Sequence, residues 1–171
     1  MDSARIARSF GLAAAGLAAA LLVAGTAAAQ DAQKADEGAL KYRQSLMESV
    51  GGDMASIMNI LKYGLPHQAN LAVHADGLAA HAKLVTSAFE RKVTAGPTDA
   101  EPEIWEKTDE FAKNVKALET ETAKLAEVVK AGDPAAIGPQ LKATGKACGT
   151  CHDNFRKPKE ESYKRNAGGG E

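Results

Sequence analysis

The stretch Cys148-Gly149-Thr150-Cys151-His152 is a C-x-x-C-H run near the end of a chain of 171 residues. On a helix, positions i, i+3 and i+4 share one face, so both thiols and the imidazole can reach one flat ligand. This spacing is typical of covalent haem c attachment, in which two thioethers hold the porphyrin and the histidine binds the iron. We therefore predict one covalent haem c per chain, held by Cys148, Cys151 and His152.

The two cysteines have three other possible uses: a redox dithiol, a disulfide, or half of a zinc site. A thioredoxin-like dithiol accompanies a βαβ pattern, which we do not find in this sequence. A zinc site needs more ligands at chelating spacing, and the other three histidines are far upstream. We favour haem over all three. Because the chain has only these two cysteines, haem attachment leaves no disulfide framework, and the fold must depend on an apolar core.

The N-terminus has the pattern of a secretory signal peptide. Arg5 and Arg8 form a basic region, residues 11–25 form a short apolar run, and residues 27–29 offer an A-x-A cleavage site. We predict cleavage after residue 29, a mature N-terminus at Gln30, and export to the periplasm. An uncleaved membrane anchor is the alternative, but the apolar run is short for a membrane span. We therefore expect no membrane span in the mature form.

Composition places the mature chain among ordinary single domains. The whole chain carries a formal net charge of −1, and it contains no basic block of the kind that binds nucleic acid. We predict one domain over residues 30–158. The charged and glycine-rich residues 159–171 are predicted to be a disordered tail.

Four long segments, at about residues 36–62, 67–92, 102–131 and 139–158, carry a helical apolar repeat. No segment longer than a few residues alternates as a strand would. Glycine and proline separate the four segments. The sequence therefore predicts an all-α protein, an antiparallel up-down-up-down four-helix bundle with haem c near one end of its core.

Two places interrupt the predicted helices. Gly51-Gly52 lies inside the first one, where each glycine costs about 1 kcal/mol relative to alanine. Either close approach to a flat ligand or a simple kink would account for them. Asp133 is a plausible N-cap before the last helix, and Pro139 predicts either a kink or the helix start itself.

Three stretches carry a resemblance to a known family. They are residues 42–47 (YRQSLM), 102–105 (PEIW) and 145–152 (GKACGTCH), the last with Phe155-Arg156. They resemble the class II c-type cytochromes, typified by cytochrome c′, and the similarity covers residues 36–158. Class I cytochromes carry the haem motif near the N-terminus instead. The resemblance implies a periplasmic four-helix haem protein, often a homodimer through its first two helices.

The resemblance also implies roles for single residues. Arg43 and Gln44 match positions that lie against the haem and its propionates, and a guanidinium is well suited to a carboxylate. Asp99 matches a loop position near the haem edge. Arg156 matches the basic residue beside the proximal histidine, where its charge could tune the iron. For each of these residues, a surface or capping role is the alternative.

Met47 matches the distal position above the iron. The resemblance allows a methionine bound to iron, as in low-spin relatives, or a lid that does not bind it, as in high-spin cytochromes c′. The residues alone also allow a flexible core filler, the commonest use of methionine. Met54 and Met58 are predicted to be such fillers.

Two functions follow from these alternatives. The first is a one-electron carrier, with iron bound by His152 and Met47, that exchanges electrons with periplasmic redox proteins. The second is a five-coordinate protein that binds nitric oxide or carbon monoxide, with Met47 as a lid. We do not expect an enzyme, because we see no distal acid–base pair, although His74 or His81 could lie near Met47.

His67, His74 and His81 recur every seven residues. Neighbours in such a row are about 10 Å apart along a helix, too far to chelate one ion. We interpret them as boundary or subunit-contact residues.

Overall fold

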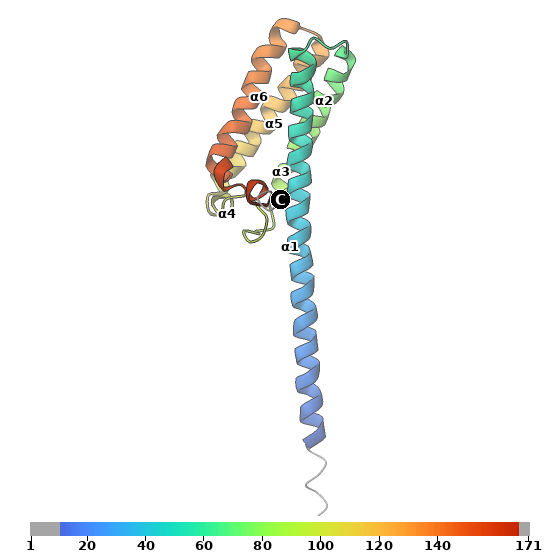
Figure 1. Ribbon diagram of the computed structural model, residues 1–171, viewed down its shortest axis with the longest axis vertical. Helices are drawn as coiled ribbons and strands as arrows, with labels where there is room; N and C mark the ends of the chain where they lie inside the picture. Colours follow the sequence, from blue (N-terminus) through green and yellow to red (C-terminus); the bar gives the residue numbers. More distant parts are fainter. Residues whose placement is uncertain (1–10, 168–171) are drawn as a thin grey trace, which may run out of the picture. The chain divides into compact units, whose positions relative to one another are not determined.

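The computed structural model describes residues 11–167, and the side chains of residues 28–165. The chain forms two units, Met1–Gly38 and Ala39–Glu171. Helix α1 (Gly11–Lys62) begins in the first unit and ends in the second (Figure 1).

The first unit contains the predicted signal peptide. Its basic region, with Arg5 and Arg8, lies outside the described residues. The alanine-rich remainder and the predicted cleavage site at residues 27–29 are helical and belong to α1, in keeping with the high helix propensity of alanine. Cleavage stays a prediction. In the described part of the chain, no helix combines the length and the apolar character needed to span a membrane.

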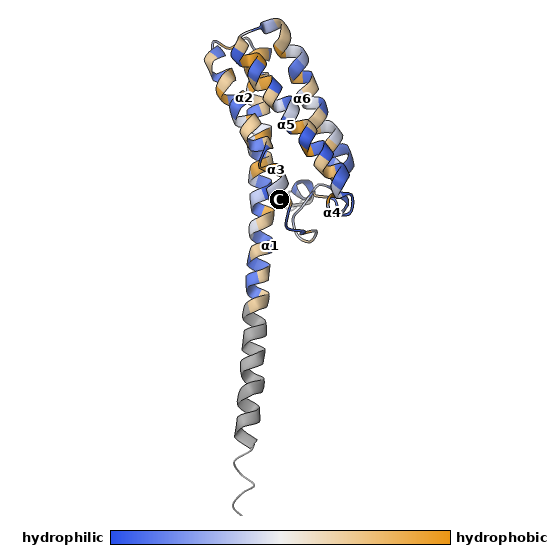
Figure 2. Ribbon diagram, turned by 180° about the vertical axis from the view of Figure 1, so that it is seen from behind, coloured by the Kyte–Doolittle hydropathy of each residue, from blue (hydrophilic) through white to orange (hydrophobic). Residues whose placement is uncertain are grey.

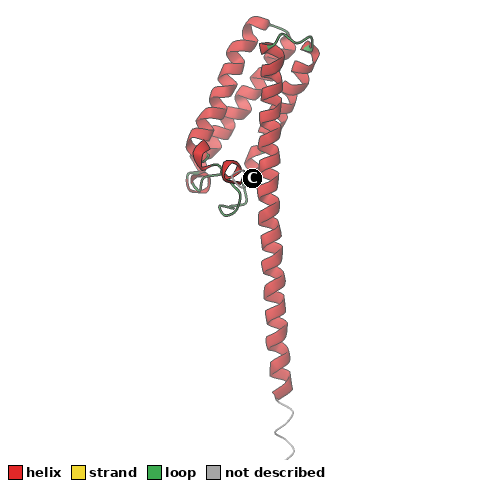
Figure 3. Cartoon of the chain, viewed as in Figure 1, coloured by secondary structure: helices red, strands yellow, loops and turns green. Residues whose placement is uncertain are grey.

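The second unit is helical, and its described residues contain no strand (Figure 3). After α1 come α2 (Gln68–Ala82), α3 (Val85–Ala88), α4 (Glu103–Glu106), α5 (Thr108–Ala131), α6 (Pro134–Phe155), the 3-10 turn η1 (Lys159–Glu161) and α7 (Tyr163–Ala167). The four long helices α1, α2, α5 and α6 run alternately up and down (Figure 1). The predicted all-α, antiparallel four-helix bundle is therefore confirmed.

The core of the bundle consists of two apolar clusters. Ile57, Leu78 and Leu125 are completely buried in the first cluster, near the α1–α2 turn. The second cluster includes Leu46 and Phe111. In Figure 2, the apolar residues of α2 and α5 alternate with polar ones along each helix, as an amphipathic helix requires. Burial of each large apolar side chain contributes about 1.5–3 kcal/mol.

Two of the predicted helices are shorter than expected. The second ends at Ala82 and is followed by the separate turn α3, and the third is divided at Lys107 into α4 and α5. Lys107 has φ −113° and ψ 54°, outside the helical region. Beyond α3, the carbonyls of Arg91 and Val93 accept hydrogen bonds from a side chain of α1. The chain there bonds to α1 and does not continue as a helix.

Helix α6 begins earlier than Pro139. Asp133 caps it, because the Asp133 carboxylate accepts the N–H of Ala135 at 3.0 Å, and Pro134 occupies the first turn. The predicted N-cap is confirmed. Pro139 lies inside the helix, so the alternative of a helix start at Pro139 is wrong.

The predicted disordered tail is also wrong for residues 159–167, which form η1 and α7. Residues 168–171 lie outside the described residues. The tail is ordered because it forms hydrogen bonds to residues far away in the sequence, at Asp99 and Glu48. Local composition gives no sign of such partners.

Helices α1 and α2 approach closely at Asp53. Its carboxylate contacts the Nδ1 atoms of His74 at 3.0 Å and His81 at 3.1 Å. A Cβ atom on Gly77, which lies between the two histidines, would be only 2.8 Å from Asp53 Oδ2. Gly77 therefore leaves the space that the carboxylate occupies.

We expect Gly77→Ala to stabilise the protein less than Gly52→Ala does, since the added methyl group must displace the end of the Asp53 side chain from its two histidines. Gly52→Ala is the control, because a Cβ there meets no atom within 4 Å. It should stabilise the helix by about 0.5–1 kcal/mol. Guanidinium unfolding of both holoproteins measures the difference. Equal stabilisation by both substitutions would contradict the close contact.

Candidate haem site

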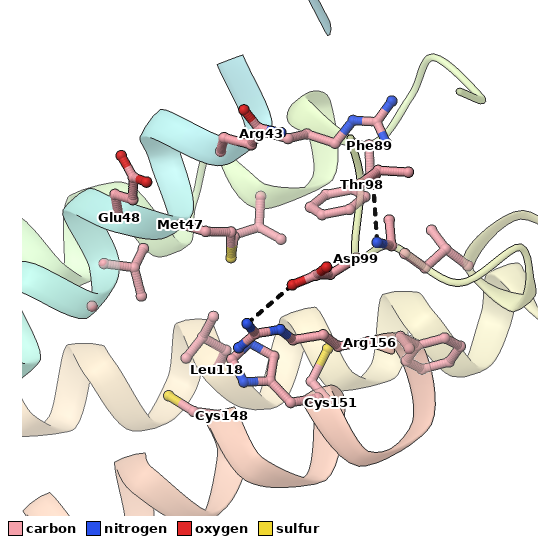
Figure 4. Close-up of a pocket in the computed structure, with 18 of the residues that line it drawn as sticks. Arg43, Met47, Glu48, Phe89, Thr98, Asp99, Leu118, Cys148, Cys151 and Arg156 are labelled. Atoms are coloured by element: carbon pink, nitrogen blue, oxygen red, sulfur yellow. Dashed lines mark hydrogen bonds and ion pairs between the residues drawn. The ribbon is translucent and has the colours of Figure 1, made fainter. Parts of the chain in front are cut away.

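A cavity of about 490 Å³ lies between α1 and α6. Close-packed protein interiors contain few voids larger than a water molecule, whereas ligand sites typically measure about 300–1,000 Å³. The cavity is therefore of the size of a ligand site. All eight predicted site residues line it: Arg43, Gln44, Met47, Asp99, Cys148, Cys151, His152 and Arg156. Those labelled in Figure 4 come from α1 (Arg43 and Met47), from the loop before α4 (Asp99), and from α6 and its end (Cys148, Cys151 and Arg156).

Helix α6 supplies one wall with Cys148, Cys151 and His152. Both cysteines are free and partly buried. Burial raises the pKa of the Cys148 thiol, and burial together with the neighbouring Cys148 raises the pKa of Cys151 to about 11. Both sulfurs are consequently uncharged thiols at neutral pH, which suits the apolar wall they form.

His152 presents a neutral imidazole to the same cavity. Burial lowers its pKa, the guanidinium of Arg156 lowers it further, and Asp153 acts in the opposite direction. A neutral imidazole retains a lone pair, and this is the form that binds a metal. The Arg156 charge therefore favours the ligating form of His152.

Helix α1 supplies the opposite wall. Met47 is partly buried, and its side chain extends from α1 into the space above Cys148 and Cys151 (Figure 4). The preceding Leu46 is 5% exposed and belongs to the core. Gly51 lines the cavity one turn further along, and α1 continues through Gly51-Gly52 without a break.

Arg43 makes contacts that the sequence does not reveal. Its side chain is 4% exposed, and its guanidinium donates to the carbonyls of Arg91 at 2.9 Å and Val93 at 3.3 Å. It also lies over the rings of Phe89 and Trp105, at 5.3 and 5.2 Å from their centroids. Arg43 thus fixes the loop after α3 to α1. Contact with a haem propionate stays a prediction.

Gln44 has a similar role, because its Nε2 donates to the carbonyl of Pro97 at 2.6 Å. The next residues of that loop carry Asp99 into the cavity wall. Arg43 and Gln44 together therefore place the loop that completes the site.

The Asp99 side chain is only 10% exposed. One carboxylate oxygen accepts from Ser162 Oγ at 2.8 Å and Arg156 Nη2 at 3.2 Å, and the other accepts the N–H of Tyr163 at 2.9 Å. Burial by itself would raise the pKa of Asp99, but these hydrogen bonds and the Arg156 charge outweigh it and hold the pKa below its ordinary value. Asp99 is therefore an ionised residue that joins three parts of the chain.

Several cavity residues were missed by sequence analysis. Phe89, Thr98, Tyr163 and Lys164 line the cavity. Phe89 lies on the predicted apolar stripe of the second helix, so periodicity could have indicated it. Tyr163 and Lys164 lie in a segment whose composition indicates disorder, and no local signal could have placed them in the site.

The residues fit a haem c. Two thiols and one imidazole on a single helix face line one apolar cavity, so Cys148 and Cys151 would hold the porphyrin through thioether bonds and His152 would bind the iron. Within the described residues, no three histidine, cysteine or acidic side chains cluster so as to hold a bare metal ion. When bound, haem c supplies an iron centre for one-electron transfer or for binding a small ligand.

Comparisons with known proteins place the chain in one family. The family model described as Cytochrome C' matches residues 38–156. A cytochrome c' of Pararhodospirillum photometricum is 37% identical over 123 residues, which cover 70% of this chain and 97% of that protein. The solved cytochrome c prime from Shewanella frigidimarina matches with a TM-score of 0.68 and 28% identity, over 72% of this chain and 97% of that one.

A nitric oxide complex of a cytochrome c prime variant from Alcaligenes xylosoxidans matches with a TM-score of 0.66 and 28% identity, over the same 72% and 97% of the two chains. The family match includes every one of the eight predicted site residues.

We expect Asp99→Asn to destabilise the holoprotein by about 1–2 kcal/mol at pH 7, since a charged acceptor of several hydrogen bonds is lost. The folded-state pKa of Asp99 is lowered from 3.8, so its contribution is present above the unfolded-state pKa and is lost as pH falls through the folded-state pKa. The difference between variant and wild type should therefore shrink below pH 3.8.

Denaturant unfolding at a series of pH values measures this difference. Asp31→Asn, at an exposed position, is the matched control and should leave stability unchanged. A difference between Asp99→Asn and wild type that does not depend on pH would contradict the account.

Proposed function

The chain belongs to the cytochrome c′ family and carries covalent haem c, and we propose that it is a periplasmic one-electron carrier whose iron is bound by His152 and Met47. Its partners in this role are other periplasmic redox proteins. The pattern of a signal peptide at residues 1–29 supports the periplasmic location.

The single observation that carries the proposal is the position of Met47 and His152. They lie on α1 and α6 and line the same cavity, with Met47 opposite the haem-attaching cysteines. A thioether and an imidazole on opposite faces of a haem form the Met/His ligation of electron-transfer cytochromes. If Met47 and His152 both held the iron, neither would have to be replaced when its oxidation state changed, which would suit transfer of one electron.

The surroundings of the site favour the reduced state. The cavity wall is mainly apolar, and the Arg156 guanidinium lies beside His152. The apolar wall would disfavour additional positive charge on the iron, whereas the Arg156 charge is offset by its ion pair with Asp99. Met/His ligation would raise the reduction potential as well. We therefore expect a potential suited to accepting electrons from weak reductants.

A five-coordinate protein that binds nitric oxide or carbon monoxide is the second candidate. It is supported by the nitric oxide complex of the similar cytochrome c prime from Alcaligenes xylosoxidans. In this alternative, Met47 is a lid on the distal side of the haem. Catalysis has less support, because the cavity residues do not include His74 or His81, which bind Asp53 instead.

A homodimer through α1 and α2 stays a prediction of the family resemblance. The exposed apolar side chains of Met58 on α1 and Val73 on α2 are suitable for such a contact.

The ferric absorption spectrum of the holoprotein distinguishes the two candidates. We expect a low-spin spectrum with a methionine-to-iron charge-transfer band, and complete loss of that band with conversion to high spin in Met47→Ala. Met58→Ala is the matched control, because Met58 is on the same helix, also lines the cavity and is 49% exposed. It should retain the wild-type spectrum.

A wild-type high-spin spectrum that is unchanged in Met47→Ala would remove methionine ligation and favour the gas-binding alternative. Loss of the band in Met58→Ala, with no change in Met47→Ala, would show that Met58 and not Met47 binds the iron, and would contradict the proposal.

A further inference from the structure

The family match ends at residue 156, but the folded chain continues through η1 and α7 to residue 167. We call residues 159–167 the C-terminal strap. We propose that this strap closes the haem cavity on the side of Met47 and Asp99, and that it limits the access of small molecules to the iron.

The strap starts from a fixed point. The N–H of Lys157 donates to the carbonyl of Asp99 at 2.8 Å, and the N–H of Glu101 donates to the carbonyl of Phe155 at 3.0 Å. These bonds flank an antiparallel bridge between Ala100 and Arg156. The chain leaving α6 is thereby attached to the loop that carries Asp99 before the strap begins.

The middle of the strap is held by the Asp99 carboxylate. Ser162 is 6% exposed and donates its hydroxyl to one oxygen, while the N–H of Tyr163 donates to the other. Arg156 also donates to this carboxylate. Hydrogen bonds to an ionised acceptor are stronger than those between neutral groups. Asp99 is therefore the residue that chiefly holds the strap in place.

The far end of the strap reaches α1. Lys164 Nζ lies 2.6 Å from Glu48 Oε1, and Glu48 directly follows Met47 in the sequence. Both charged side chains are more than half exposed, which places this pair at the solvent edge of the cavity. Exposed ion pairs contribute little to stability. We therefore expect the Lys164–Glu48 pair to orient the strap, while the hydrogen bonds to Asp99 supply most of its stability.

The strap is therefore part of the cavity wall. Tyr163 and Lys164 line the same cavity as Met47, Asp99 and His152. In Figure 1, α7, at the red end of the colour scale, lies beside α1. The strap therefore borders the cavity between α1 and the Asp99 loop, where it can limit the entry of a small molecule. Opening of the strap requires only local loss of a few hydrogen bonds, without unfolding of the bundle.

The test measures carbon monoxide binding to the ferrous holoprotein by flash photolysis. All strap variants are made in a Met47→Ala background, so that the comparison does not depend on whether Met47 binds the iron. A chain that ends at Pro158 should bind carbon monoxide several-fold faster than the full chain. Ser162→Ala should give a smaller increase in the same direction. Glu160→Gln, an exposed strap position, is the matched control and should leave the rate unchanged.

The ion pair is tested by charge reversal. Lys164→Glu should increase the rate, and the double variant Glu48→Lys with Lys164→Glu should return it toward the full-chain value. Hydrogen exchange gives a second readout without carbon monoxide, since the amide of Tyr163 should be protected in the full-length holoprotein and should lose protection in Ser162→Ala.

A folded chain ending at Pro158 that binds carbon monoxide at the full-chain rate would overturn the proposal. If that chain does not fold, the point variants decide. An unprotected Tyr163 amide in the full chain, or unchanged rates in both Ser162→Ala and Lys164→Glu, would overturn it equally. None of these outcomes bears on whether Met47 binds the iron, which the ferric absorption spectrum tests separately.

Discussion

The structure depends on one arrangement: two thiols and an imidazole on a single face of α6 border a cavity whose other wall is α1. The spacing of Cys148, Cys151 and His152 places all three on that face, and a bundle helix presents such a face toward the core. Aromatic side chains pack closely beside the cavity. The ring of Phe111 contacts those of Phe89 and Phe155, each with centroids 5.3 Å apart. The helices therefore pack tightly beside the cavity and leave room for a flat ligand.

Long polar side chains complete the wall that the helices leave open. Arg43 and Gln44 reach from α1 to backbone carbonyls of the loop after α3, and Asp99 binds the end of the chain. Buried charged groups are tolerated where hydrogen bonds satisfy them, and the two Nη atoms of Arg43 and the Asp99 carboxylate meet that condition. The same residues that the family resemblance places near haem thus also build the site, so substitution of one of them changes both structure and haem environment.

Local patterns in the sequence predicted the parts of the structure that depend on local physics. Helical periodicity predicted the four long helices, Asp133 predicted an N-cap, and the C-x-x-C-H spacing predicted the ligating face. The predictions that were wrong depend on distant partners. The second helix was predicted to continue to residue 92, but the carbonyls of that segment accept hydrogen bonds from Arg43, about fifty positions earlier in the chain. The strap was predicted to be disordered, but it is bound by Asp99, more than sixty positions before it. No window of neighbouring residues contains that information.

The most direct test of the account is the intact mass of the exported protein, measured together with a titration of free thiols. The account predicts a chain heavier by one haem than the polypeptide cleaved after residue 29, with no free thiol at Cys148 or Cys151. A polypeptide with no added group and two free thiols would contradict it, because the cavity between α1 and α6 would then have another purpose.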